Sequence, residues 1–499
     1  MNRRDFLKHS GALLGPFAAG PGLLHAQSFY AKQMENGTIY AADPRWSNGL
    51  PDLEPLSHGI ILGRPTDTSI CAKVMATEDM YFFLEYGIDP QYMVDRTETI
   101  TLSKGQTAAL TVDGLNLNTR YYYCIWKGLV DANACEPGGL FSFHTQRLQG
   151  TPFTFVVQAD PHLDEQSIPE LYERTLINES ADDPDFVIDL GDTPMSDKVR
   201  PKIYELIEKR YLVQQSYFSL LCHSVPLFLV LGNHDAEAGW ECDGTADNLA
   251  VWSTLLRKKY FPNPLPDGFY TGLQIEEEFV GLRQNYYSWQ WGDALFVVLD
   301  PYWYTKTKPG EKADGWTWTL GEEQYHWFRQ TISDCNATFK FVFCHQLIGG
   351  DAQGRGGVEW IPYYEMGGHN IDGAWGFDQH RPSWDKPIHQ LMVDNNVTIF
   401  FHGHDHFYAK QDLDGIIYQL VPQPSHRNYK KVNQAQEYGY LNGEILPNSG
   451  HLRVTVRSSE VIVEYVRTYL PETENAERIN GQVSNTYHIE HHSDSYSSK

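Results

Sequence analysis

One short stretch near the C-terminal third constrains the fold of this chain more than any other. An apolar run, residues 397–401, is followed by His-Gly-His-Asp-His at residues 402–406. The run predicts a short buried strand that ends at the glycine. Alternate residues of an extended chain point the same way, so His404 and His406 can reach one point in space. Histidines spaced like this also occur in loops and packed cores, so the stretch alone does not establish a site.

Four further apolar runs end in the same manner, each with polar residues just past its C-terminal end. In an open α/β sheet, binding sites form at this end of the strands. Aspartate, histidine and asparagine are ligands that suit borderline divalent metals. The four runs are residues 156–162, ending in Asp160-Pro161-His162; residues 186–192, ending in Gly191-Asp192; residues 227–235, ending in Gly232-Asn233-His234-Asp235; and residues 339–345, ending in His345.

Helical patterns alternate with these strand-like runs. Such alternation predicts a layered α/β fold rather than an all-α or all-β one. The expected helices span residues 167–181, 199–222, 245–260, 321–335 and 385–395, and further strands are expected at 285–290, 294–300, 416–421, 452–456 and 461–466.

Taken in order, the motifs D-x-H, G-D, G-N-H-D, H and G-H-x-H resemble those of the calcineurin-like metallophosphoesterases. The resemblance covers roughly residues 150–470. It implies a four-layer α/β (α+β) fold, in which two β-sheets pack face to face and helices flank them outside. It also implies hydrolysis of phosphoric esters with two metal ions, such as Mn, Fe or Zn, among which the sequence does not choose.

The resemblance also implies roles for individual residues. A hydroxide bridging the two metals would be the nucleophile, with no covalent enzyme intermediate. The implied ligands are Asp160, His162 and His406 for the first metal, Asn233, His345 and His404 for the second, and Asp192 as the bridge.

Two catalytic residues follow from the G-N-H-D motif. By the same resemblance, His234 would protonate the leaving oxygen or stabilise transition-state charge, and Asp235 would orient His234. The alternatives are a plain turn residue for His234 and a helix N-cap for Asp235. Purple acid phosphatases carry a tyrosine three residues after the bridging aspartate, where this chain has Met195. The iron–tyrosinate centre of that subgroup is therefore not expected.

The region before the catalytic domain has two parts. Residues 1–26 begin with Arg3-Arg4-x-Phe-Leu-Lys and continue into a short apolar segment, which resembles a twin-arginine signal peptide. We therefore expect the twin-arginine export machinery as a partner, and a periplasmic or extracellular location; a chance basic N-terminus is the alternative. Residues 50–147 contain spaced short β-rich runs, which predict a small β-sandwich.

Within this sandwich, Leu-x-Leu-x-Thr-x-Tyr-x-Tyr at residues 115–123 resembles the tyrosine corner of fibronectin type III domains. A similar sandwich precedes the catalytic domain of purple acid phosphatases, so we expect a spacer or packing domain rather than a binding module. At the other end of the chain, residues 471–499 are polar and are expected to form a loosely ordered tail. No segment after the signal is long and apolar enough to span a membrane.

Composition limits the partners. A net charge of −25 argues against a general nucleic-acid binder, but not against a phosphate substrate, since bound metals reverse the local charge. The seven cysteines are too sparse for a disulfide framework. Three insertions rich in aromatic residues, 262–283, 301–319 and 346–384, either wall a substrate pocket or pack against themselves. Arg355 either grips phosphate or is a solvated loop charge.

These features together predict an exported, dimetal-dependent phosphoric-ester hydrolase. A phosphomonoesterase is favoured because the layout of sandwich plus catalytic domain resembles secreted phosphatases. A phosphodiesterase acting on nucleotides or glycerophosphodiesters is the alternative. A non-catalytic binding protein would carry damaged ligand positions, and every position named above is intact.

Overall fold

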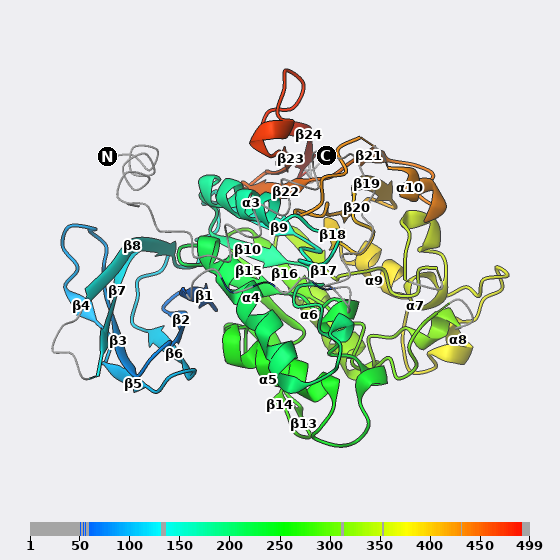
Figure 1. Cartoon of the computed structure of the whole chain (residues 1–499). Helices are drawn as coiled ribbons and strands as arrows, with labels where there is room; N and C mark the ends of the chain where they lie inside the picture. Colours follow the sequence, from blue (N-terminus) through cyan, green and yellow to red (C-terminus); the bar gives the residue numbers. More distant parts are fainter. Residues whose placement is uncertain are drawn as a thin grey trace, which may run out of the picture.

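The computed structural model describes residues 59–491, apart from 131–135, 311–313, 352–353 and 431, together with residues 50, 53 and 55. The expected signal peptide, residues 1–26, lies outside the described residues. A small β-rich domain stands beside a larger layered domain (Figure 1). Among the described residues, no helix has the length and apolar character needed to cross a bilayer.

Two sheets form the small N-terminal domain. Their facing side chains share one core that includes Leu62, Val74, Leu84 and Tyr123. The Asn116 amide donates a hydrogen bond to the Tyr121 hydroxyl at 2.9 Å, the contact that a tyrosine corner requires. One sheet has β1 (Ile61–Gly63), β2 (Ile70–Met75) and β6 (Thr107–Val112); the other has β3 (Met80–Gly87), β4 (Asp95–Arg96), β5 (Ile100–Leu102), β7 (Arg120–Leu129) and β8 (Glu136–His144).

The N-terminal domain contacts the larger domain at the C-terminal ends of helices. The Tyr123 hydroxyl donates to the His223 carbonyl at 2.6 Å, and the Thr107 hydroxyl donates to the Lys259 carbonyl at 3.0 Å. The chain leaves each of these helices toward the start of the next strand or loop. Sites in such folds form at the other end of the sheet, where parallel strands end. The small domain therefore packs away from the expected site.

The larger domain contains a six-stranded sheet whose first three strands are parallel. These strands are short, continuous apolar runs, as expected for strands covered on both faces. In spatial order the sheet contains β11 (Leu227–Leu229), β10 (Phe186–Asp189), β9 (Phe153–Gln158), β22 (Gly450–Val456), β23 (Glu460–Arg467) and β24 (Val483–Glu490).

An eight-stranded sheet packs against it face to face. The shared core is rich in aromatic rings: Phe155, for example, meets Phe296 edge-on with 5.1 Å between ring centres. In spatial order this sheet contains β12 (Thr271–Gly272), β15 (Tyr287–Trp291), β16 (Ala294–Val298), β17 (Phe339–Phe343), β18 (Ile399–His402), β20 (Ile416–Leu420), β19 (Tyr408–Leu413) and β21 (Glu444–Leu446); a separate hairpin joins β13 (Glu276–Glu277) and β14 (Gly281–Leu282).

Helices cover the outer face of each sheet, which confirms the predicted four layers (Figure 1). All five predicted helices are present, with ends shifted by a few residues. The six-stranded sheet is covered by α3 (Pro169–Ala181), α4 (Tyr204–Cys222) and α5 (Leu249–Tyr260). The eight-stranded sheet is covered by α6 (Glu322–Asp334), α7 (Tyr364–Gly367), α8 (Phe377–His380) and α9 (Ile388–Asp394); α10 (Asn433–Glu437) lies near β19.

The expectation of a loosely ordered C-terminal tail is wrong for residues 483–490. These residues form β24, which pairs antiparallel with β23 at the edge of the sheet. Its inward side chains are Asn485, Tyr487 and Ile489, and the Tyr487 hydroxyl donates to Gln419 Oε1 at 2.9 Å. Only one of the inward side chains, Ile489, is aliphatic. The sequence of this strand therefore shows no clear alternation of apolar and polar residues.

Cys71, Cys222, Cys242, Cys335 and Cys344 are free thiols, in keeping with the prediction that the chain has no disulfide framework. Cys344 is fully buried at the end of β17 and packs in the core beneath α6 and α9. Its burial indicates a packing role.

Candidate metal centre

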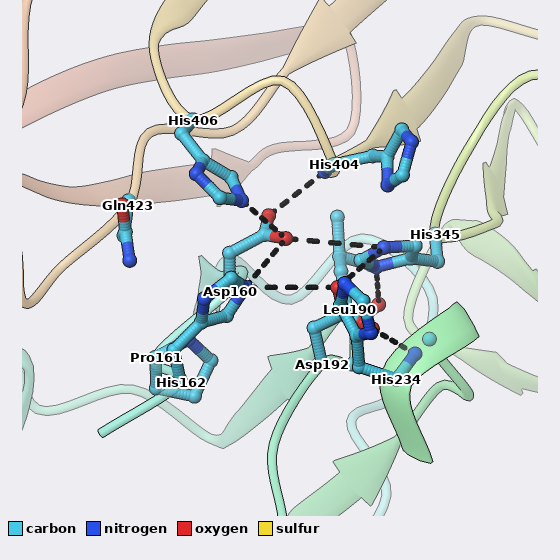
Figure 2. Close-up of polar contacts among 12 residues, drawn as sticks. Asp160, Pro161, His162, Leu190, Asp192, His234, His345, His404, His406 and Gln423 are labelled. Atoms are coloured by element: carbon cyan, nitrogen blue, oxygen red, sulfur yellow. Dashed lines mark hydrogen bonds and ion pairs between the residues drawn. The ribbon is translucent and has the colours of Figure 1, made fainter. Parts of the chain in front are cut away.

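Six of the seven predicted ligands come together where β9, β10, β17 and β18 end (Figure 2). Two groups of three residues each place one ligand atom per residue within 4.8 Å of one another. The first group is Asp160, His162 and His406, and the second is Asp192, His345 and His404. The first group is the predicted first set, and the second joins the predicted bridge Asp192 to His345 and His404 of the predicted second set.

The two oxygens of the Asp160 carboxylate have different surroundings. Oδ2 accepts a hydrogen bond from the backbone N–H of His404 at 2.8 Å. Oδ1 makes no hydrogen bond and lies 3.3 Å from His406 Nε2 and 3.6 Å from His162 Nε2. One oxygen thus fixes the loop after β18, and the other faces the imidazoles.

Asp192, of the second group, is arranged in the same way and also approaches the first group. Its Oδ1 accepts from the backbone N–H of His234 at 2.7 Å. Its Oδ2 has no hydrogen bond and lies 3.4 Å from His345 Nε2 and 3.6 Å from His162 Nε2. Because His162 and His345 belong to different groups, Asp192 is placed to bridge them.

Several polar atoms at the centre are buried without a hydrogen-bond partner, although such atoms usually have one. All of them are carboxylate or amide oxygens, or imidazole nitrogens, which are the donor atoms of a Zn, Mn or Fe site. The residues present therefore fit a pair of cations. The atoms are Asp160 Oδ1, His162 Nε2, Asp192 Oδ2, Asn233 Oδ1 and His345 Nε2.

In two of the imidazoles, the ring nitrogen that points away from the centre, Nδ1, contacts a neighbouring oxygen. His162 Nδ1 lies 3.0 Å from Asp164 Oδ2, and His345 Nδ1 lies 2.8 Å from the Leu190 carbonyl. These oxygens accept a hydrogen bond from Nδ1–H, so in the neutral ring the lone pair is on Nε2, which faces the centre. Asp164 was not assigned a role from the sequence; its position two residues after His162 was the available signal.

The backbone at the centre is unusual. Asp160, His162, Asp192, His404 and His406 have φ values of 58°, 49°, 56°, 77° and 61°. This left-handed region is uncommon for residues other than glycine, and such strain concentrates at functional sites. The conformation turns each side chain sharply out of the preceding strand and toward the others.

Gly403 is required by the close approach of two ligand loops. A Cβ at this position would lie 2.6 Å from Asp160 Oδ2 and 2.8 Å from Ala159 Cβ. We expect Gly403→Ala to displace the Asp160 carboxylate and to lower metal affinity and kcat/KM by roughly 10–100-fold. Metal analysis and kinetics on the purified variant measure this. Gly310→Ala, whose added methyl meets open space, is the matched control, and equal metal content in the two variants would contradict the prediction.

The electrostatics of the site keep both carboxylates ionised. Burial raises the pKa of Asp160 and of Asp192, but the imidazoles beside them outweigh this and hold both pKa values below the usual range. Burial lowers the pKa of His345, but Asp192 and Asp160 outweigh it and raise the value to about 9. Since a metal binds neutral imidazole, cation binding would release a proton here.

Asp197, not Asp235, is the carboxylate that contacts His234. His234 Nδ1 lies 2.9 Å from Asp197 Oδ1, and the His234 side chain is 22% exposed. The loop after Asp192 turns back at Met195, whose φ is 57°, and brings Asp197 under the imidazole. No motif marks Asp197, so sequence reasoning missed it.

The prediction that Asp235 orients His234 is therefore wrong. The buried Asp235 carboxylate accepts backbone N–H groups of Gly232, Thr193 and Asp192 at 2.7, 2.8 and 3.1 Å. It is not a helix N-cap either, because it ends the short 3-10 helix Asn233–Asp235. The Asp235 carboxylate thus binds backbone N–H groups and not the His234 imidazole. Through these bonds Asp235 links the loop after β10 to the loop after β11.

Arg355 is engaged by the protein and is not placed as a phosphate ligand. Its Nη1 donates to the His404 carbonyl and to Asp405 Oδ1, both at 3.0 Å. Its guanidinium also lies 4.5 Å from the centre of the Tyr438 ring. Asp405 is buried and attracts this cation, so Arg355 holds the turn that carries His404 and His406.

The aromatic residues of one insertion, residues 301–319, are largely buried in the larger domain. In the insertion at 301–319, the exposed fractions of Tyr302, Trp303, Trp316 and Trp318 do not exceed 6%. Tyr302, Trp316 and Trp318 belong to the core outside the eight-stranded sheet, so packing is the reading that the structure favours for these rings.

A buried ion network supports the segment that follows His234. Glu237 binds Arg257 at 2.5 Å and Arg283 at 3.3 Å, and Arg283 also binds Asp300 at 3.1 Å. Removing one partner of a buried pair leaves the other charge uncompensated. We expect Glu237→Ala to lower the free energy of unfolding by about 3–5 kcal/mol.

Denaturant unfolding of wild type and variant measures this loss. Glu208→Ala is the control, because Glu208 pairs with Lys259 at a partly exposed position and should cost about 1 kcal/mol or less. Equal losses for the two variants would count against the network.

Comparisons with known proteins agree with this geometry. No curated protein sequence matches the chain. The solved structure of PhoD is 13% identical, with a TM-score of 0.60, and the match covers 88% of this chain and 92% of PhoD. Purple acid phosphatase PPD1 from yellow lupin seeds is 15% identical, with a TM-score of 0.56, covering 86% of this chain and 74% of that one. At these identities the two structures show a shared fold.

The family match comes from the sequence itself. The model of the calcineurin-like phosphoesterases matches residues 153–408, just over half of the chain. That range begins at β9 and runs past His406, so it contains every predicted ligand. The protein is a metal-dependent phosphoesterase. The chain thus belongs to the calcineurin-like phosphoesterase family.

Proposed function

We propose that the protein is an exported, dimetal-dependent phosphoric-ester hydrolase that acts on phosphomonoesters. The observation that carries this proposal is the set of buried, unpartnered donor atoms at the centre, all from predicted ligands. A binding protein that had lost catalysis would not need to keep this set intact beside His234.

In this proposal Asp160, His162 and His406 hold one ion, Asn233, His345 and His404 hold the other, and Asp192 bridges. Two ions bound there would lower the pKa of a water toward ~7 to supply a nucleophile and would clamp the attacking and leaving oxygens. Mn, Fe, Zn or similar ions suit this donor set.

The chain's own residues then complete the reaction. His234 is the general acid that protonates the leaving oxygen, and Asp197 holds its ring. Asp164 and the Leu190 carbonyl keep His162 and His345 in the tautomer that can bind metal. Asp235 keeps the two central loops together.

Export and the role of the small domain form part of the proposal. The Arg3-Arg4 segment supports twin-arginine export to the periplasm or beyond. The Asn116–Tyr121 contact supports a fibronectin type III-like sandwich that serves as a packing domain. This layout, together with the likeness in fold to a purple acid phosphatase, favours monoesters over diesters.

The test compares hydrolysis of p-nitrophenyl phosphate and bis-p-nitrophenyl phosphate by the same preparation. The protein is stripped of metal and reloaded with Mn, Fe, Zn or Co, and Asn233→Ala is the control for the metal centre. Faster monoester hydrolysis that Asn233→Ala abolishes supports the proposal. Faster diester hydrolysis would replace it with a phosphodiesterase, and no hydrolysis with any metal would replace it with a binding function.

A further inference from the structure

One insertion, residues 301–319, reaches the side of the centre where His234 lies. The Gly239 amide donates to the Tyr302 carbonyl at 3.0 Å, which ties the insertion to the segment just after His234. Tyr302 and Trp303 are buried, and the Thr305 hydroxyl donates to the Pro301 carbonyl at 2.8 Å. The beginning of the insertion is therefore fixed, and it presents the following residues beside His234.

Lys308 is the residue so presented. Its Nζ lies 4.0 Å from Asp197 Oδ2, while the other oxygen of Asp197 contacts His234 at 2.9 Å. The Lys308 side chain is 61% exposed, whereas that of Asp197 is 11% exposed. At 4.0 Å the ammonium makes no hydrogen bond with Asp197, so its donors can bind another anion.

The other cations near this point are engaged differently. Lys306, on the same insertion, donates to the Trp303 carbonyl at 3.1 Å. Arg355 is held by Asp405 and the His404 carbonyl. The ammonium of Lys308 thus lies exposed beside the partner of His234, in a protein whose net charge is −25.

Given the proposed function, on which this inference rests, we propose that Lys308 binds a second anionic group carried by the leaving group of the substrate. His234 donates its proton to the leaving oxygen, so the rest of the leaving group extends past His234. Lys308 is placed on that side, next to the partner of His234. The favoured substrate class is then a phosphate monoester whose alcohol bears a carboxylate or another phosphate.

A matched pair of substrates tests this: 3-phosphoglycerate, which carries a carboxylate, and glycerol 3-phosphate, which does not. We expect the wild type to prefer 3-phosphoglycerate in kcat/KM, and Lys308→Ala to reduce that preference about fivefold, mainly through KM. Lys308→Arg should retain it, and added salt should weaken it. Lys306→Ala removes the same charge from the same insertion and should leave the preference as it is.

Two results would overturn the inference: no preference in the wild type, or equal loss for both substrates in Lys308→Ala. Titration calorimetry on metal-loaded His234→Ala protein gives a readout that does not need turnover. There, adding Lys308→Ala should weaken binding of 3-phosphoglycerate about fivefold more than that of glycerol 3-phosphate. Lack of p-nitrophenyl phosphate hydrolysis with any metal would instead reject the proposed function, and the calorimetric comparison would still decide on Lys308.

Discussion

Replacing Asp192 by Asn is expected to lower kcat/KM for p-nitrophenyl phosphate by at least about 10³-fold. The substitution keeps an oxygen that can accept the His234 backbone N–H, now bonded at 2.7 Å. It replaces the other oxygen, which lies 3.4 Å from His345 and 3.6 Å from His162, with an uncharged amide. Losing the shared charge between two cations removes several kcal/mol of stabilisation, which corresponds to this factor.

Metal analysis and kinetics after reloading measure the effect of Asp192→Asn. The variant should fold as wild type by circular dichroism but bind less metal, because the hydrogen bond to His234 is kept. Asp412→Asn is the control: its carboxylate is exposed and pairs with Lys410 alone, so metal content and rate should not change. Full activity in Asp192→Asn would show that this carboxylate does not bridge.

The grouping of the candidate ligands could be predicted from the sequence because their positions are encoded locally. Each one follows an apolar run, and a strand delivers the residue after its end to the same edge as its neighbours. Asp160 and Asp192 illustrate this, since β9 and β10 are adjacent and parallel. The layered fold was predictable for the same reason, because strands and helices alternate with clear periodicity.

The partners of the ligands could not be predicted, since they depend on how loops turn. Asp235 stands next to His234 in the sequence, yet three backbone N–H groups hold it, and Asp197 arrives from another loop. Judged by its place in the sequence, Arg355 was likewise free to bind phosphate. In the structure it binds the buried Asp405 instead. In each case a buried charge is satisfied by the nearest groups in space, which sequence order does not reveal.

Replacing His234 by Ala is expected to lower kcat by about 10²–10⁴-fold while both metals remain bound, because His234 supplies a proton and not a metal ligand. Its ring lies outside the two ligand groups and is held by Asp197. Asp197→Asn should cost less, since the amide oxygen can still accept a hydrogen bond from Nδ1–H.

The dependence on the leaving group decides whether His234 is a general acid. Nitrophenolate leaves readily without a proton, whereas an alkoxide does not, so His234→Ala should slow glycerol 3-phosphate far more than p-nitrophenyl phosphate. Charge stabilisation by the imidazole would slow the two substrates equally. Metal analysis of the same samples excludes a third cause, because loss of an ion would also slow both. A rate loss that is equal for both substrates, at full metal content, would therefore assign His234 to charge stabilisation and leave protonation of the leaving oxygen to solvent.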